Sequence, residues 1–154
     1  MPFRLATAVF VITTAAVRAD IQPVDGQWSG TWTMISNTGC PPQMVQQISQ
    51  LGASERSYSQ PITFPNPFQP DALQGDFTWT KLAENKWHAV HTESSATGMG
   101  VISVVTQHVL TVLSPVTMTQ DVNATVTFPK KLAEMAKMAG TECTWAARVD
   151  HHTP

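Results

Sequence analysis

Two cysteines, Cys40 and Cys143, are the only thiols in the chain and the residues best suited to covalent chemistry. They could form a disulfide, or they could act as a redox or metal-binding pair. A redox motif places its cysteines close together, as in C-x-x-C, whereas these two lie far apart. We therefore predict a disulfide that joins the early and late parts of the chain. It closes a loop of roughly a hundred residues, for which the chain-entropy model gives about 4–5 kcal/mol.

Five histidines are candidates for metal binding or acid–base chemistry. His88 and His91 lie in a predicted strand, where alternate side chains point to opposite faces, so they cannot jointly hold a metal. His151 and His152 are expected on a C-terminal tail over residues 150–154. The sequence thus predicts no metal site, and it predicts no cofactor.

Motifs of nucleophilic or metal-dependent catalysis do not occur in the sequence: G-x-S-x-G, H-E-x-x-H and C-x-x-C are all absent. Asp76, Glu84 and Glu93 surround a predicted hairpin, but the sequence does not give the separation between carboxylates that a glycosidase requires. An enzyme would need a cleft with a pair of charged groups that the linear sequence does not show. The prediction leans towards a non-enzymatic protein.

Aromatic residues on the predicted strands are the remaining candidate feature. Such side chains either pack as core or line the apolar wall of a ligand cavity, and core packing is the simpler interpretation. As lining residues of a ligand cavity we single out Trp28, Trp32, Phe77, Trp79, Trp87 and Trp145.

The first nineteen residues have the layout of a cleavable secretory signal peptide. Arg4 precedes an uncharged run over residues 5–16, and the small or modest side chains of Val17 and Ala19 lie three residues and one residue before a cut at Asp20. The run is too short for a transmembrane helix, which needs about 20 apolar residues, and no later stretch is long enough. We expect a periplasmic or secreted protein, in an oxidising compartment that favours the disulfide.

Residues 20–154 are expected to form a single β-rich domain. Without Arg4 and Arg18, seven basic residues face eleven acidic ones, which gives a formal charge of −4. No basic run exceeds two residues, so a nucleic-acid partner or an anionic membrane surface is disfavoured. Only 13% of the chain is charged, and abundant Ser and Thr favour sheet over a charged helical bundle.

Alternating apolar and polar residues predict about seven to nine antiparallel strands. The clearest segments are 26–34, 75–82, 87–92, 101–113, 116–120, 122–128 and 141–149. Short helices are predicted over 43–51 and 129–139. Four prolines make 58–73 a long loop, either a plain connector or a lid. Because such a sheet must curl to protect its edges, we predict an antiparallel barrel or half-barrel, with a β-sandwich as the alternative.

Gly26, Gln27 and Trp28 open the first predicted strand with a pattern that resembles the Gly-x-Trp opening of lipocalins and other calycins. The early and late cysteines and a helix near the C-terminus are also similar, and the chain resembles small two-cysteine envelope proteins of proteobacteria. The resemblance implies a cup for a ligand. We therefore predict a β-barrel that binds a small apolar molecule. The alternative is an envelope protein–protein interaction module that uses an exposed face or the proline loop.

Overall fold

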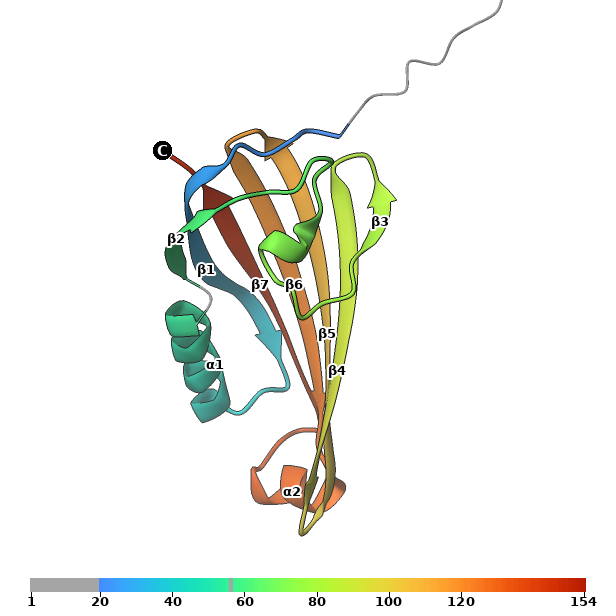
Figure 1. Cartoon of the computed structure of the whole chain (residues 1–154). Helices are drawn as coiled ribbons and strands as arrows, with labels where there is room; N and C mark the ends of the chain where they lie inside the picture. The colour runs from blue at the N-terminus through green and yellow to red at the C-terminus, as the bar shows by residue number, and fades with distance from the viewer. Residues whose placement is uncertain (1–19, 56) are drawn as a thin grey trace, which may run out of the picture.

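The fold is a single curled antiparallel sheet, seen in a computed structural model that describes residues 20–55 and 57–154. Seven strands in the order β2-β1-β7-β6-β5-β4-β3 form a half-barrel, accompanied by two helices (Figure 1). The predicted mainly β half-barrel is thereby confirmed, whereas the signal peptide predicted over 1–19 lies outside the described residues. Among the described residues, no helix combines the length and hydrophobicity needed to cross a membrane.

Long strands dominate the architecture. The elements are β1 (Gly26–Thr38), α1 (Pro42–Glu55), β2 (Tyr58–Ile62), a 3-10 turn (Pro70–Ala72), β3 (Thr80–Ala83), β4 (Lys86–Thr97), β5 (Gly100–Ser114), β6 (Thr117–Thr127), α2 (Lys130–Met135) and β7 (Glu142–His152). The two strands predicted over 116–120 and 122–128 are one strand, because Asp121 keeps the ladder intact between Val109 and Arg148. The strand predicted over 75–82 is mostly loop, and only its end forms β3.

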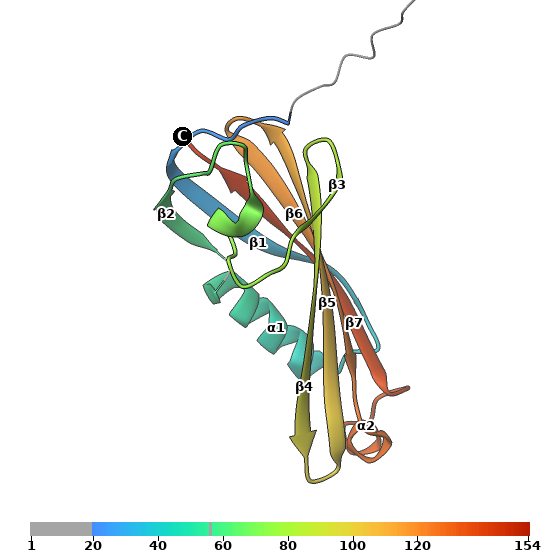
Figure 2. The same ribbon diagram turned by 45° about the vertical axis from the view of Figure 1, so that its right-hand side comes forward.

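The two faces of the sheet differ along every long strand. In β6, Met118, Gln120 and Val122 are buried on the concave face, while the residues between them are partly exposed on the convex face. This is the period-two alternation expected of a sheet with one covered side. The cover consists of α1 and the loop over residues 63–79, which both lie on the concave side (Figure 2).

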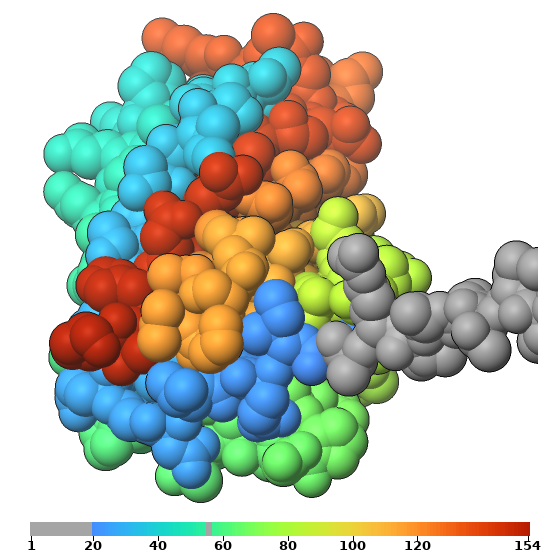
Figure 3. All heavy atoms as spheres, turned by 90° about the horizontal axis from the view of Figure 1, so that it is seen from above, coloured from blue at the N-terminus to red at the C-terminus, as the bar shows by residue number. Residues whose placement is uncertain are grey.

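One end of the concave face is filled by an aromatic chain. Phe64 and Phe68 from the loop bridge Trp28 in β1 and Trp87 in β4, with successive ring centroids 5.4, 5.5 and 4.9 Å apart. Since three strands (β7, β6 and β5) lie between β1 and β4 in the sheet, the two phenylalanines close the half-barrel at this end. Seen from above, the segment after Asp20, the β5–β6 turn and the loop lie side by side over that end (Figure 3).

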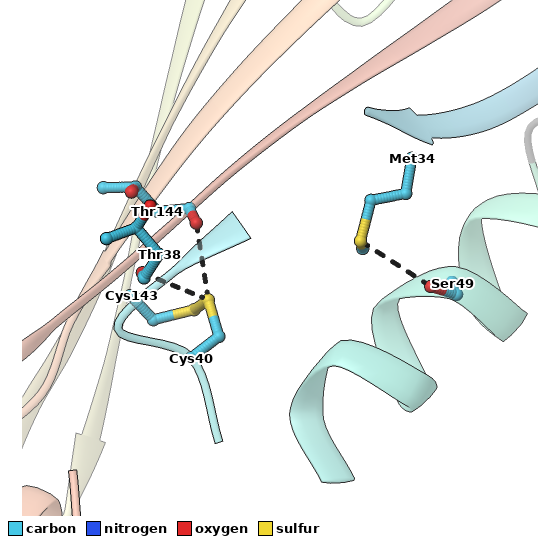
Figure 4. Close-up of a disulfide and its surroundings, with 6 residues drawn as sticks. All are labelled: Met34, Thr38, Cys40, Ser49, Cys143 and Thr144. Atoms are coloured by element: carbon cyan, nitrogen blue, oxygen red, sulfur yellow. Dashed lines mark hydrogen bonds between the residues drawn. A yellow bond between two sulfur atoms is a disulfide. The ribbon is translucent and has the colours of Figure 1, made fainter. Parts of the chain in front are cut away.

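A second cover is formed by α1, which packs on β1. Gly52 permits the approach, because a Cβ there would lie 2.5 Å from the Trp32 ring. The predicted disulfide is confirmed just before this helix: Cys40 is bonded to Cys143 in β7, with a Cα–Cα distance of 4.5 Å (Figure 4). The disulfide ties the start of the helix to the sheet. Further along the helix, the Ser49 hydroxyl donates a hydrogen bond of 3.7 Å to Met34 Sδ in β1.

Candidate functional site

An open cleft of about 790 Å³ lies on the concave face, beyond the aromatic core. This volume falls within the range of roughly 300–1,000 Å³ that is typical of small-molecule sites. One wall comes from the loop and the others from β4, β5 and β7. The lining residues are Leu73, Gln74, Gly75, Asp76, Phe77, His91, Glu93, Val104, Thr106, His108 and Trp145.

Strand register explains why these side chains meet. His91 lies opposite Thr106 in the β4–β5 ladder, and Glu93 lies opposite Val104, so all four share the concave face. The next ladder position on that face across β6 is occupied by Ala124, which is buried and small. At these positions β4, β5 and β6 carry smaller or polar side chains, whereas at the filled end they carry large apolar ones. The cleft is the space that the smaller side chains leave above the sheet.

Aromatic rings provide the flat surfaces of the cleft. The ring of Phe77 lies 4.4 Å from the ring of His108 and 5.7 Å from that of His91, measured between centroids. Trp145 lines the other side and is held edge-on by Trp32 at 6.4 Å. Such walls suit a planar or apolar group, and they can also attract a cation through the ring faces.

The charged groups of the cleft are acidic. Asp76 and Glu93 line it, while no lysine or arginine is among its lining residues in the described chain. His91 Nε2 lies 2.8 Å from Glu93 Oε1, and both side chains are substantially exposed. An imidazole and a carboxylate can each form hydrogen bonds, so the two side chains give the cleft a polar wall.

A buried amide joins the floor of the cleft to the loop. The Gln120 side-chain nitrogen donates to Nδ1 of His108 at 2.9 Å and to Oε1 of Gln74 at 2.8 Å. Gln120 is 1% exposed, so both of its amide hydrogens need partners inside the protein. The two hydrogen bonds fix the loop residue that forms the rim of the cleft.

A smaller side pocket of about 270 Å³ adjoins the cleft, and both are lined by Leu73 and Gln74. Its other lining residues are Tyr58, Gln60, Gln120, Val149 and His151. The Tyr58 hydroxyl lies 2.9 Å from Nδ1 of His151. Gly30 makes room for this pair, since a Cβ there would be 2.3 Å from the Tyr58 ring.

The pair between Tyr58 and His151 is uncharged near neutral pH. Burial raises the pKa of the Tyr58 hydroxyl to about 12. Burial, and secondarily the neighbouring His152, lowers the pKa of His151 to about 4. Nε2 of His151 is buried without a hydrogen-bond partner among the described residues. An unsatisfied buried polar atom costs about 1–3 kcal/mol, so a partner at this position would be stabilising.

The six aromatic residues proposed as cavity lining are divided among three places. Phe77 and Trp145 line the cleft. Trp28 and Trp87 belong to the core of the filled end, with Trp79 packed against it. Trp32 lies in a separate cluster beside α1. Within residues 20–55 and 57–154, no group of three or more His, Cys, Asp or Glu side chains is arranged to hold a metal.

The burial of His108 and His151 on the concave face was not predicted from the sequence. His151 was expected on a tail, yet β7 continues to His152 and buries His151. The alternation of Ala147, Val149 and His151 carries that signal. His108 shares the buried face of β5 with Leu110 by the same rule. Asp76 and Glu93 were noted, but their common cleft depends on how the loop folds back over β4 and β5.

Comparisons with known proteins leave the cleft as the basis for function. No protein-family model matches the chain, and no curated protein and no solved structure matches it either.

Proposed function

We propose that this protein is a non-enzymatic binding protein whose cleft holds a small amphipathic molecule with a positively charged group. The observation that carries the proposal is the combination of a cavity of about 790 Å³, aromatic walls, and two carboxylates with no lysine or arginine among the described lining residues. The ligand-binding cup implied by the Gly-x-Trp opening agrees with this role. The disulfide between Cys40 and Cys143 supports work in a periplasmic or secreted setting.

The aromatic walls define the apolar part of the ligand. Phe77 and Trp145 lie on different elements of the cleft, one on the loop and one on β7. A ring or short hydrocarbon group between them would be removed from water, at about 25 cal/mol per Å² of buried apolar surface. The apolar ligand predicted from the sequence is therefore kept in this proposal as the apolar part of an amphipathic ligand.

The carboxylates define the polar part. Asp76 from the loop and Glu93 from β4 place negative charge in the cleft, and its described lining residues include no lysine or arginine. An ammonium group is complementary to this arrangement, whereas an anion would meet like charge.

The proline loop supports the ligand proposal better than a partner-binding role. Its side chains Phe64 and Phe68 are 6% and 3% exposed and pack against the sheet. They are therefore committed to the fold and are not available to a protein partner.

A matched probe set tests the charge preference. Phenethylamine, phenethyl alcohol and phenylacetate share an aromatic ring and carry a positive, neutral and negative group respectively. We expect phenethylamine to bind most tightly in NMR titrations, with shifts at Phe77 and Trp145, and its affinity to fall as salt is added.

Glu93→Gln is the variant that isolates the carboxylate. At a charge separation of about 4 Å in a wet site the interaction is worth about 1 kcal/mol, so we expect phenethylamine affinity to fall about fivefold. Asp150→Asn is the control, because Asp150 is exposed on the convex face and the charge change is the same. Equal affinity for all three probes, or equal losses in both variants, would overturn the proposal.

A further inference from the structure

The side pocket differs in chemistry from the cleft that it adjoins. Its described lining residues offer a hydroxyl, an imidazole and the amides of Gln60, Gln74 and Gln120, and none of these residues carries a carboxylate or an ammonium group. Each of these side chains can donate or accept a hydrogen bond. The lining therefore complements a group that is uncharged and that both donates and accepts.

His151 gives this pocket a polar atom that still lacks a partner. The residue is 4% exposed, and its Nδ1 is already engaged by Tyr58, while Nε2 has no hydrogen-bond partner among the described residues. Buried polar atoms in folded proteins are almost always hydrogen-bonded to protein, water or ligand. His151 therefore adds to the lining of the side pocket an imidazole that has one nitrogen unpaired among the described residues.

The size and position of the pocket make it a part of the cleft's site. At about 270 Å³ it falls just below the range of independent small-molecule sites, roughly 300–1,000 Å³. It meets the cleft at Gln74 and across the 2.9 Å hydrogen bond between Gln120, which lines the side pocket, and His108, which lines the cleft. One extended molecule can therefore occupy both.

We infer that the side pocket is a second subsite, which takes an uncharged carboxamide-type group of the same ligand whose cationic and aromatic part occupies the cleft. This inference rests on the proposed function, because it takes the cleft as the primary site. The ligand class is then a short, amide-containing molecule with an aromatic group and an ammonium group at one end.

Peptide amides of graded length provide the probes. Phenylalanine amide and its analogues extended by one, two and three glycines carry the ring and ammonium group of phenethylamine, and each added residue extends the reach by about 3.5 Å. We expect affinity to rise about two- to tenfold when a carboxamide first reaches the side pocket, the effect of one added hydrogen bond. The side-chain amide signals of Gln60 and Gln120, which line the side pocket and not the cleft, should shift with the long probes and not with phenethylamine.

Gln60→Leu removes one amide of the pocket from an exposed position on the edge strand β2, where it is compatible with folding. We expect it to lower the affinity of the extended probes about two- to tenfold and to leave phenethylamine unchanged. Gln27→Leu is the matched control, since Gln27 is exposed on the opposite face of the neighbouring strand β1. Tyr58→Phe, which keeps the ring over Gly30 and removes the hydroxyl, should act like Gln60→Leu.

The outcomes separate the two proposals. If phenethylamine binds but the extended probes gain nothing, or if Gln60→Leu and Gln27→Leu have the same effect, the second subsite is overturned and the cleft stands. If phenethylamine fails to bind, the proposed function is overturned. Extended probes that bind without phenethylamine, with sensitivity to Gln60→Leu, would support the side pocket while rejecting the cleft as the primary site.

Discussion

The filled end and the hollow part of the concave face are built from the same strands. In β5, Leu110 and Val112 are buried in the aromatic core, while Thr106 and Val104, a few positions away on the same face, line the cleft. Backbone pairing is continuous through both regions. The difference therefore lies in side-chain size and in what covers the sheet, and one ladder supports both a packed core and a cavity.

The loop over residues 63–79 links the two regions. Its first part places Phe64 and Phe68 in the core, and its last part places Asp76 and Phe77 in the lining of the cleft. The apolar burial of the first part holds the second part in position. The rim of the cleft is therefore held in place by side chains that are buried in the core, and these side chains do not occupy the cleft itself.

The largest expected effect comes from cutting back one side chain in each region of β5. Leu110→Ala removes a fully buried side chain, and we expect it to lower the free energy of unfolding by about 2–5 kcal/mol. Val104→Ala shortens a half-buried side chain at the cleft, and its cost should stay below about 1.5 kcal/mol because no closed cavity is left. Urea denaturation measures both. Equal losses would contradict the contrast between packed and hollow regions.

A pH titration tests the polar residue buried beside the filled end. The pKa of His151 is about 4 in the folded chain and about 6.5 unfolded, so the unfolded state takes up a proton first as the pH falls. Stability is therefore retained above about pH 6.5 and declines between pH 6.5 and 4, by about 3 kcal/mol nominally.

Thermal and urea unfolding at pH 7, 5.5 and 4 would measure this loss, and His151→Gln should flatten the profile. His88→Gln serves as the control, because His88 is half-buried on the convex face and opposite the short strand β3. A steep profile that persists in His151→Gln would assign the acid sensitivity to other groups.

The sequence predicted the features that depend on local pattern and compartment. Alternation at Trp28, Gly30 and Trp32 correctly identified β1. The wide spacing of Cys40 and Cys143, taken with the predicted export, led to the disulfide, which is confirmed. Period-two burial needs no knowledge of distant contacts. The curled antiparallel sheet follows from the same pattern and from the need to protect its edges.

Features that depend on tertiary contact were not predicted. The prolines of 58–73 predict a loop, and this prediction is wrong at Pro61, which lies in β2, because an edge strand tolerates a residue without a backbone donor. Phe77 and Trp79 were expected on a strand, but they belong to the loop that folds over the sheet. The cleft was missed for the same reason: Asp76 and Glu93 share it only once that loop is in place.

The smallest predicted effect concerns the second cover, α1, which reaches β1 but leaves the cleft open. Gly52→Ala would bring a methyl group within 2.5 Å of the rigid Trp32 ring, a clash that costs about 1–3 kcal/mol. Alanine regains about 1 kcal/mol of helix propensity, so we expect a net loss of about 1 kcal/mol. Gly98→Ala is the control, since a Cβ at Gly98 has nothing within 4 Å and should change stability by less than about 0.5 kcal/mol.

The same variant separates the two regions functionally. Trp32 contacts Trp145 at 6.4 Å between ring centroids, and Trp145 lines the cleft, so displacing α1 should disturb the cleft wall. We expect the folded Gly52→Ala variant to bind phenethylamine more weakly than the unsubstituted protein. The Leu110→Ala variant, measured under conditions in which it is folded, should bind phenethylamine with nearly unchanged affinity. NMR titration of both variants would measure this. If Leu110→Ala weakened binding as much, the packed end and the hollow part would have to be treated as one mechanical unit, because damage to the core would then reach the cleft through the shared strand β5.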